Sequence, residues 1–372
     1  MSRPDSPAPR RRPTIVDVAR RAGVSAAAVS FAVNDRPGVS SGTRERILAA
    51  ARELGWQPSA SARALTEART RAVGLVLART AGQLEGDSFF VRFLTGIERA
   101  LTTADYALLL KIVPGEASSA LPAYERLSAA GRVDGFLLTD IEVDDPRFAL
   151  LQAAAMPVVL AGRPAGRSPF PCVETRHDEG IAPAVAHLVS LGHERIAFLG
   201  GRDEYEHVRV REAAWRTALT AAGLAPGPVA SAGDAVASPD PAASPGPAVA
   251  GPEPAANRAR TAALALLRQE PTAIVCSNDA LAIEAIGAAR SGGLVVPDDL
   301  SVVGFDDSAL AAFAAPALTT VRVDYGELGE AAARALLACI AGEPPPEYAP
   351  SAPELIVRGS TGRVPPRWRS GS

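Results

Sequence analysis

The side chains most often used for catalysis are few in this chain and widely spaced. Its 372 residues include four histidines and three cysteines. The cysteines, Cys172, Cys276 and Cys339, have neither metal-ligand nor redox spacing. The histidines suggest no catalytic triad, and the chain has no Walker-type phosphate loop and no nucleophile elbow. We therefore predict a protein of a reducing compartment that is not an enzyme and holds no metal or cofactor.

The charged residues are distributed unevenly along the chain. Residues 1–70 hold twelve arginines, no lysine and six carboxylates, a net charge of +6, whereas the remainder carries −9. A basic head on an acidic body indicates a polyanion-binding module joined to a domain that is not one. A solvated basic tail would explain Arg10 to Arg12, but not the arginines spread through patterned helices.

A stretch near the N-terminus, residues 14–34, has the pattern of two short helices. Apolar residues recur at helical spacing behind Thr14, which is an N-cap candidate. Gly23 breaks this first run, and Ser25 can cap a second helix. Two short helices joined by a tight glycine-containing turn form a helix-turn-helix, whose second helix can enter a major groove.

A third helix is expected over residues 41–54, with Ile47, Leu48, Ala51 and Leu54 on its apolar face. Three helices within about forty residues can enclose a minimal core. That is enough for a small DNA-binding head.

Residues 58–70 connect this head to the body. Pro58 and Ser59 can start a helix of only about two turns, and isolated helices of that length are marginal in water. The segment is therefore expected to order only when something docks against it. A flexible tether agrees with the spacing about equally well.

From Arg71 onward, short apolar runs alternate with amphipathic helices. The first run is 72–78, the last of the series is 301–305, and about eleven strands are expected. This alternation indicates parallel sheets covered by helices on both faces. Eleven strands exceed one doubly wound sheet, so we predict two α/β lobes with a ligand cleft between them, beyond the carboxyl ends of the strands.

Both parts of the chain resemble the LacI/GalR family of bacterial transcriptional regulators. The likeness is carried in the head by TIVDVARRAGVSAAAVSFAVN and RPGVSSGTRERILAAARELGWQPSASARAL, and in the body by FFVRFLTGIERAL, LGHERIAFLGG, PTAIVCSNDALAIEAIGAARSGGLVVPDDLSVVGFDD and PALTTVRVDYGELGEAAARALL. The arrangement is highly specific to this family: a helix-turn-helix head, then a hinge helix, then a periplasmic-binding-protein-like body. The resemblance implies a cytoplasmic repressor, a homodimer that binds near-palindromic double-stranded operator DNA and a small-molecule effector, expected to be a sugar or sugar derivative.

The resemblance also implies a division of the chain. We expect a disordered tail at 1–12, a helix-turn-helix domain at 13–57, a hinge at 58–70, an effector-binding and dimerisation domain at 71–365 and a tail at 366–372. Within the body we expect an N-lobe of about 71–173 and 324–353, a C-lobe of about 174–322 and 354–365, and a Pro- and Ala-rich low-complexity insert at about 225–257.

The family's phosphate and groove-edge contacts fall on Thr14, Ser25, Ser30 and Asn34. Their hydroxyl and amide groups can hydrogen-bond to DNA and so position the protein without reading sequence. Ser25 can also serve simply as an N-cap. Since a helix N-terminus is itself a phosphate site, the two roles are compatible.

The family's base-reading positions fall on Ala26, Ala27 and Phe31, none of which can form a bidentate hydrogen bond with a base. Specificity would then depend on apolar contacts, on the hinge and on DNA shape. A place in the core of the head is the alternative for Phe31.

The hinge carries a further set of implied DNA contacts. Leu65 matches the leucine that family members insert into the minor groove at the operator centre, where an apolar wedge kinks the duplex. Ala62 and Arg63 lie beside it in the sequence.

The resemblance implies an effector site that draws on many parts of the body. Its candidate residues are Phe89, Phe90, Arg163, Tyr205, His207, Arg211, Asn278, Asp279 and Asp306. One of the two phenylalanines is expected to belong to the core, and Arg163 is equally suited to an ion pair between the lobes. Many relatives have Asp-Asn where this chain has Thr175-Arg176-His177, so a contact to ligand hydroxyls is expected to be lost or altered.

A sugar-binding protein of the transport type is the alternative, because it shares the two-lobed fold. The basic head and the lack of an apolar leader argue against it. No apolar run approaches the length of a membrane span. The segment after Thr361 has no leucine heptad, which favours a dimer over a coiled-coil tetramer.

Overall fold

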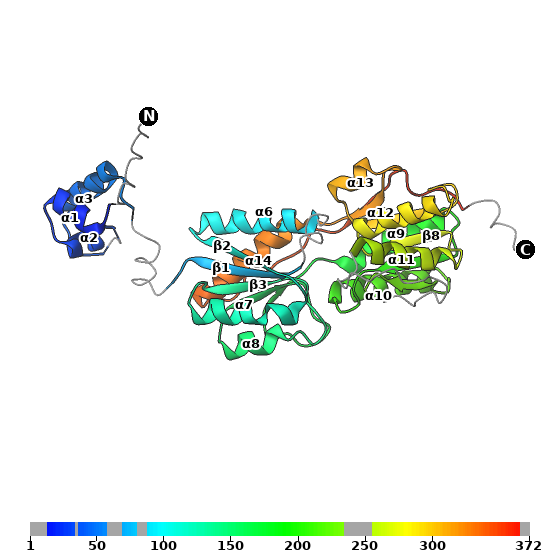
Figure 1. Cartoon of the computed structure of the whole chain (residues 1–372), viewed down its shortest axis with the longest axis horizontal. Helices are drawn as coiled ribbons and strands as arrows, with labels where there is room; N and C mark the ends of the chain where they lie inside the picture. The colour runs from blue at the N-terminus through cyan, green and yellow to red at the C-terminus, as the bar shows by residue number, and fades with distance from the viewer. Residues whose placement is uncertain (1–12, 34–35, 58–68, 80–87, 234–254, 365–372) are drawn as a thin grey trace, which may run out of the picture. The chain divides into compact units, whose positions relative to one another are not determined.

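The chain forms two compact units, residues 1–70 and 71–372 (Figure 1). The computed structural model describes residues 13–33, 36–57, 69–79, 88–233 and 255–364. The predicted terminal tails, most of the hinge and much of the insert lie outside these ranges. So do four candidate DNA contacts, namely Asn34, Ala62, Arg63 and Leu65.

The first unit contains three described helices, which are α1 (Ile15–Ala22), α2 (Ala26–Val33) and α3 (Ser41–Leu54). Thr14 stands at the N-cap of α1, and its backbone N–H and its hydroxyl donate to the Asp17 carboxylate at 2.9 and 2.7 Å. The Ser25 hydroxyl accepts the N–H of Ala28 at 3.1 Å and so caps α2. These two caps confirm the predicted starts of the first two helices.

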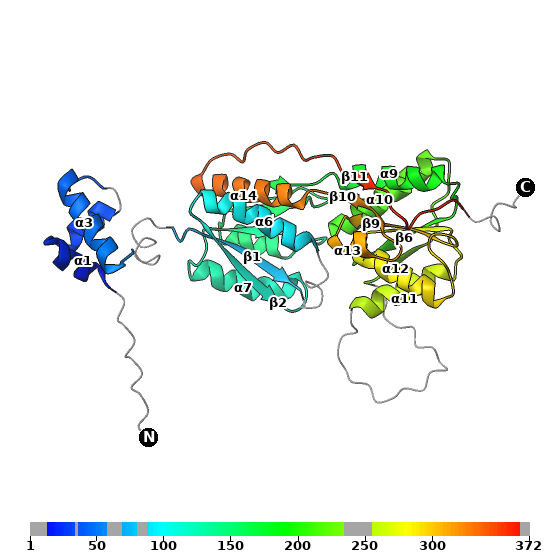
Figure 2. The same cartoon turned by 90° about the horizontal axis from the view of Figure 1, so that it is seen from above.

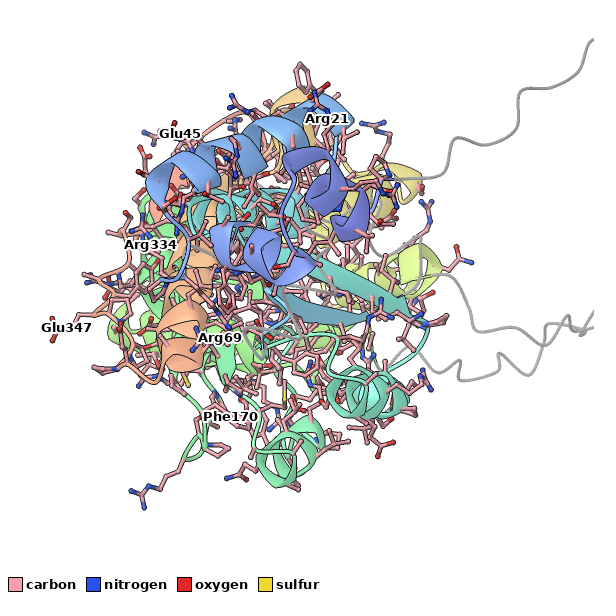
Figure 3. All side chains as sticks on the ribbon, turned by 90° about the vertical axis from the view of Figure 1, so that its left-hand side faces the viewer. Arg21, Glu45, Arg69, Phe170, Arg334 and Glu347 are labelled. Carbon is pink, nitrogen blue, oxygen red and sulfur yellow. The ribbon has the colours of Figure 1, made fainter. Side chains whose placement is uncertain are left out.

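The head encloses a small core in which Val18, Val29 and Ile47 are fully buried. On α3 the buried residues are Ile47, Ala50 and Ala51, three and four positions apart, whereas Leu48 is 40% exposed. The expectation that Leu48 lies on the buried face is therefore wrong, because one further residue turns a helix by about 100°. Arg21 on α1 (Figure 3) forms an ion pair of 2.7 Å with Glu53 on α3, which adds to the helix contacts.

The second unit contains two sheets flanked by helices, as predicted (Figure 2). The first sheet is parallel throughout, with the order β2-β1-β3-β4-β5. Its strands are β1 (Ala72–Ala78), β2 (Ala107–Val113), β3 (Gly135–Leu138), β4 (Val158–Ala161) and β5 (Cys172–Val173). Its helices are α6 (Ser88–Thr103), α7 (Ala117–Ala129), α8 (Arg147–Ala153) and α14 (Tyr325–Ala341). Phe170 lies on the loop before β5 (Figure 3). Its ring meets that of Phe148 on α8 edge-on.

The second sheet has the order β11-β10-β9-β8-β6-β7, and only β11 runs antiparallel to its neighbour. Its strands are β6 (Ile196–Gly200), β7 (Val229–Ser231), β8 (Ala273–Cys276), β9 (Ser301–Asp306), β10 (Thr319–Arg322) and β11 (Glu354–Ile356). Its helices are α9 (His177–Ser190), α10 (Glu206–Ala221), α11 (Ala255–Leu267), α12 (Asp279–Ser291) and α13 (Ala309–Phe313).

Helix α11 was not expected from the sequence, and it begins inside the segment assigned to the insert. It buries Ala259, Ala262, Ala263 and Leu266, which recur at helical spacing. Alanine has the highest helix propensity, so a short Ala-rich run can form a helix once a sheet covers one face. The helical spacing of these residues is visible in the sequence, but the Pro- and Gly-rich segment before them obscured it.

Helices α6 and α14 pack against each other at very short range (Figure 2). A Cβ added to Gly329 on α14 would overlap the backbone carbonyl of Phe93 on α6. A Cβ at Gly96 would likewise overlap the carbonyl of Gly326. The two glycines thus permit backbone contact between helices that are far apart in the sequence.

We expect Gly329→Ala to lower the free energy of unfolding of the body by about 1–3 kcal/mol, the usual cost of overpacking. Urea denaturation followed by circular dichroism measures this change. Gly287→Ala on α12 is the matched control, because the nearest atom to its new Cβ is Arg260 Nη1 at 3.8 Å. Equal stability of the two variants would show that α6 and α14 can separate without cost.

Candidate functional site

The exposed face of α2 carries the predicted base-reading residues. Ala26, Ala27 and Phe31 are all exposed, whereas Val29 and Ala32 point into the core of the head. Phe31 is 40% exposed and lies outside the buried cluster, which disfavours the alternative of a core role. An exposed row of small and aromatic side chains can contact thymine methyl groups, but it offers no hydrogen-bonding group to a base.

In the body, a cavity of about 1280 Å³ is lined by residues that follow strands of both sheets. The candidate effector residues in its wall are Phe89, Arg163, Tyr205, His207, Arg211, Asn278, Asp279 and Asp306. Phe90 is instead buried in the core, and the Phe89 ring stacks on Phe93 and meets Tyr325 edge-on. The cavity lies beyond the carboxyl ends of parallel strands, where ligands of open α/β sheets bind.

Arg211, on α10, occupies the centre of the cavity wall. Its Nη2 donates to the Tyr325 hydroxyl at 3.1 Å and lies 3.6 Å from Oδ1 of Asp306. The Tyr325 hydroxyl in turn donates to that same carboxylate oxygen at 2.5 Å. These contacts join three elements at one point: Arg211 on α10, Asp306 at the end of β9 and Tyr325, the first residue of α14.

His177 is a further neighbour of Arg211, and it was not among the candidate site residues. Its Nδ1 lies 3.1 Å from Arg211 Nη2, and its Nε2 lies 2.8 Å from the Thr175 hydroxyl. Because a guanidinium only donates, Nδ1 must accept and Nε2 must carry the proton. Burial, and then the charge of Arg211, hold the His177 pKa well below its ordinary value. The Thr175-Arg176-His177 stretch therefore places a neutral imidazole beside the arginine.

Arg79 and Asp140 form a second polar group in the cavity wall, and sequence reasoning missed both. The guanidinium makes two hydrogen bonds to the carboxylate, at 2.8 and 2.6 Å. Burial opposes ionisation of Asp140, but Arg79 outweighs burial and holds its pKa below the usual value. Arg79 also lies over the rings of Phe90 and Tyr205, at 4.9 and 5.8 Å. The two residues follow β1 and β3, which are neighbours in the sheet, so the strand order was the missing signal.

Two of the candidates are already satisfied by the protein itself. The Asn278 side chain caps α12 by accepting the Leu281 N–H at 2.8 Å. Asp279 is only 2% exposed and accepts the N–H of Ser308 at 2.6 Å and the hydroxyl of Thr320. Both residues shape the cavity wall, and Asp279 offers a ligand little free hydrogen-bonding capacity.

Arg163 forms an ion pair of 2.6 Å with Glu174, in the segment that leaves β5. Its side chain is 69% exposed, so the pair is worth little in water. No group of histidine, cysteine and acidic side chains in the described ranges is arranged to hold a metal ion. In the same ranges, no helix is both long and apolar enough to cross a bilayer.

Comparison with known proteins agrees with this geometry. Residues 14–59 match the model for bacterial regulatory proteins of the lacI family, and residues 185–361 match that for a periplasmic binding protein-like domain. The HTH-type transcriptional regulator MalR of Streptomyces coelicolor is 36% identical, over 94% of this chain and 97% of MalR.

Two solved structures are similar over almost the whole chain. The lac repressor dimer bound to operator and the anti-inducer ONPF has a TM-score of 0.77 at 25% identity. The match covers 95% of this chain and 100% of the repressor chain. The complex of the transcriptional regulator CelR with cellobiose has a TM-score of 0.63 at 28% identity, and the match covers 94% of this chain and 100% of the CelR chain. A helix-turn-helix head on a two-lobed body with a cavity defines a class of transcriptional regulators. Within that class, this chain belongs to the lacI family of bacterial regulatory proteins.

The cavity also generates a prediction about pH. Burial and the charge of Arg211 lower the pKa of His207 to about 3. Between this value and the unfolded value near 6.5, the unfolded chain binds the proton and the folded chain does not, so stability falls as pH falls. From pH 6.5 to pH 5 the loss from His207 is at most about 2 kcal/mol.

Urea midpoints of the full chain at pH 6.5 and pH 5 measure this loss. We expect His207→Gln to lose less stability on acidification than the unsubstituted chain, because its side chain does not titrate. His187→Gln is the control, since its ring hydrogen-bonds Thr361 and does not line the cavity. Identical pH dependence with and without His207 would contradict the assignment.

Proposed function

We propose that this protein is an effector-controlled transcriptional repressor that binds operator DNA as a homodimer. The observation that carries the proposal is the combination, in one chain, of an exposed α2 face and a large cavity between two lobes. Two of its structural relatives, a repressor dimer bound to operator and a regulator bound to cellobiose, support the same roles here. Such a protein acts in the cytoplasm, where the chromosome is.

In this proposal the head positions the protein on DNA. The hydroxyls of Thr14, Ser25 and Ser30 contact phosphates, while Ala26, Ala27 and Phe31 face base edges. With no bidentate reader on α2, the hinge and DNA shape contribute much of the specificity. Leu65 of the hinge acts as the wedge in the minor groove.

The cavity provides the control, because its wall contains contacts that cross from one lobe to the other. Next to the wall, Arg92 of α6 donates to the backbone carbonyls of Asp306, which lines the cavity, and of Asp307, at 3.2 and 2.5 Å. The Asp306 carboxylate faces Arg211 and Tyr325. A ligand that binds one arrangement of the lobes better shifts the population toward it, and thereby changes operator affinity.

A sugar or sugar derivative fits the chemistry of the cavity wall. Hydroxyl groups need both donors and acceptors, which arginine and carboxylate side chains supply, and Phe89 offers an apolar ring. A buried hydroxyl left unpaired costs about 1–3 kcal/mol, so the polar side chains of the cavity wall select their ligand by hydrogen bonding.

Selection of DNA fragments by the purified protein, followed by sequencing, tests the first half of the proposal. Screening the bound complex against a panel of sugars tests the second half. Recovery of no preferred palindrome, with sugar binding intact, would instead favour a sugar-binding protein of the transport type.

We expect Arg211→Ala to bind operator normally and to lose its response to the effector, because the arginine lies in the cavity wall and not in the head. Gel-shift titration with and without a sugar that the panel screen shows to bind measures both properties. Arg216→Ala is the control, because Arg216 lies five residues further along α10, outside the cavity wall, and pairs with Glu212 at 2.7 Å. A normal response in Arg211→Ala would remove this residue from the site.

We expect Leu65→Ala to weaken operator binding by about 10- to 100-fold at fixed salt, since loss of the wedge removes a few kcal/mol of contacts. Sedimentation velocity should show an unchanged dimer. Unchanged operator affinity would exclude the wedge role, and a dissociated dimer would assign Leu65 to assembly.

A further inference from the structure

The exposed face of α2 is apolar at positions where direct readout of bases normally uses hydrogen-bonding side chains. Ala26 and Ala27 are exposed and Phe31 is 40% exposed, whereas Ser30, the one polar residue within α2, is half-buried. Ala27 and Phe31 are four positions apart, so their side chains are neighbours on one face of the helix. In a helix-turn-helix, the N-terminal part of the second helix contacts base edges in the major groove. This face therefore meets the bases through carbon atoms.

The position of the Phe31 ring is set by the protein itself. A Cβ added to Gly38 would lie 3.3 Å from Cδ2 and 3.6 Å from Cε2 of this ring, so one ring edge packs against the Gly38 backbone. Gly38 has φ of 117°, a conformation that favours glycine. A second contact comes from the Arg36 N–H, which donates to the Phe31 carbonyl at 2.9 Å. Because the ring is held in advance, it loses little conformational entropy when it contacts a base.

Carbon side chains distinguish one feature of the pyrimidine edges in the major groove. Thymine presents a C5-methyl group and the O4 acceptor, whereas cytosine presents the N4 amino donor and no methyl group. An alanine methyl or a phenylalanine ring neither donates nor accepts a conventional hydrogen bond, so it does not distinguish O4 from N4. It does gain from burying the methyl group. Thymine and 5-methylcytosine therefore offer the same contact to this face of α2.

We infer that α2 recognises the C5-methyl groups of pyrimidines, with Phe31 as the contacting residue and Gly38 as its positioning residue, so that 5-methylcytosine can replace thymine in the operator. The inference rests on the proposed function, because it concerns the operator of the same head. Burial of one methyl-sized group corresponds to about fourfold in affinity, and to about 16-fold for a homodimer that meets it in both half-sites. Cytosine methylation at such a position would then tighten operator binding independently of the effector.

The first experiment uses the full chain and a palindromic DNA recovered by the selection described above. Deoxyuridine replaces thymine at each position in turn, in both half-sites, which removes the methyl group and leaves the base pair intact. At one or more positions we expect the gel-shift Kd at fixed salt to rise about 16-fold. At the same positions, operators with cytosine and with 5-methylcytosine opposite guanine should differ by a similar factor.

Two outcomes of this experiment separate the inference from the proposed function. Changes of less than about twofold at every thymine overturn the inference, while the recovered palindrome still supports a DNA-binding regulator. A methyl effect for thymine but not for cytosine also overturns it, because the face would then distinguish the two bases. Recovery of no preferred DNA counts against the proposed function itself.

Phe31→Ala assigns the methyl effect to α2. We expect the ratio of thymine to deoxyuridine affinity to fall from about 16-fold to less than about threefold at the position that Phe31 contacts, because the ring that buries the methyl group is gone. Leu48→Ala is the matched control, since Leu48 is also 40% exposed but lies on α3, and it should keep the full ratio. The same ratio in Phe31→Ala as in the unsubstituted chain would remove Phe31 from this role.

Gly38→Ala tests the positioning role and leaves the ring in the chain. The new Cβ presses against Phe31, so we expect the same thymine to deoxyuridine ratio to fall by about threefold or more. Gly55→Ala is the control, because Gly55 also has a positive φ of 63° but a Cβ there meets no atom within 4 Å. Each ratio is measured within one variant, so a general loss of affinity does not change it. Equal ratios in the two variants would show that Gly38 does not position the ring.

Discussion

The body of this protein depends on how the end of β9 is attached to both lobes. Arg92 of α6 holds the carbonyls of Asp306 and Asp307, while the Asp306 carboxylate accepts from Tyr325 and faces Arg211. Both aspartates have positive φ, 111° and 48°, a conformation that residues other than glycine rarely adopt. Surrounding hydrogen bonds must hold such a backbone in place. The same hydrogen bonds connect the cavity wall to the helix pair α6 and α14.

Charge compensation is the second organising constraint. Arginines reach the cavity from both lobes, and nearly every one meets a carboxylate, so the wall presents hydrogen-bonding groups without a strong positive field. The histidine rings stay neutral because burial and Arg211 both oppose protonation. The head is different in kind, since its excess of arginine suits a polyanion. The chain thus separates a basic DNA-facing part from a cavity with balanced or negative charge.

Local patterns predicted the elements well where apolar spacing was regular. The third helix and β1 have the expected bounds, and the caps at Thr14 and Ser25 formed as expected. The predictions failed where packing against other elements decides whether a residue is buried or whether a segment forms a helix. Leu48 stands one residue beyond the buried face of α3, and α11 needed a sheet to cover its small alanine face.

By itself, the sequence determined the fold class and the order of head and body, and eight of the nine candidate effector residues that it indicated do line the cavity. Periodicity and sequence motifs could supply this much because they are local properties of the chain. Only the tertiary structure decided which side chains meet. Arg79 and Asp140 are 61 positions apart and meet because they follow the neighbouring strands β1 and β3. Arg211 and Asp306 are 95 apart, and they meet because α10 brings the arginine to the end of β9. The tautomer of His177 was likewise undetermined until Arg211 was placed beside it, since a guanidinium can only donate.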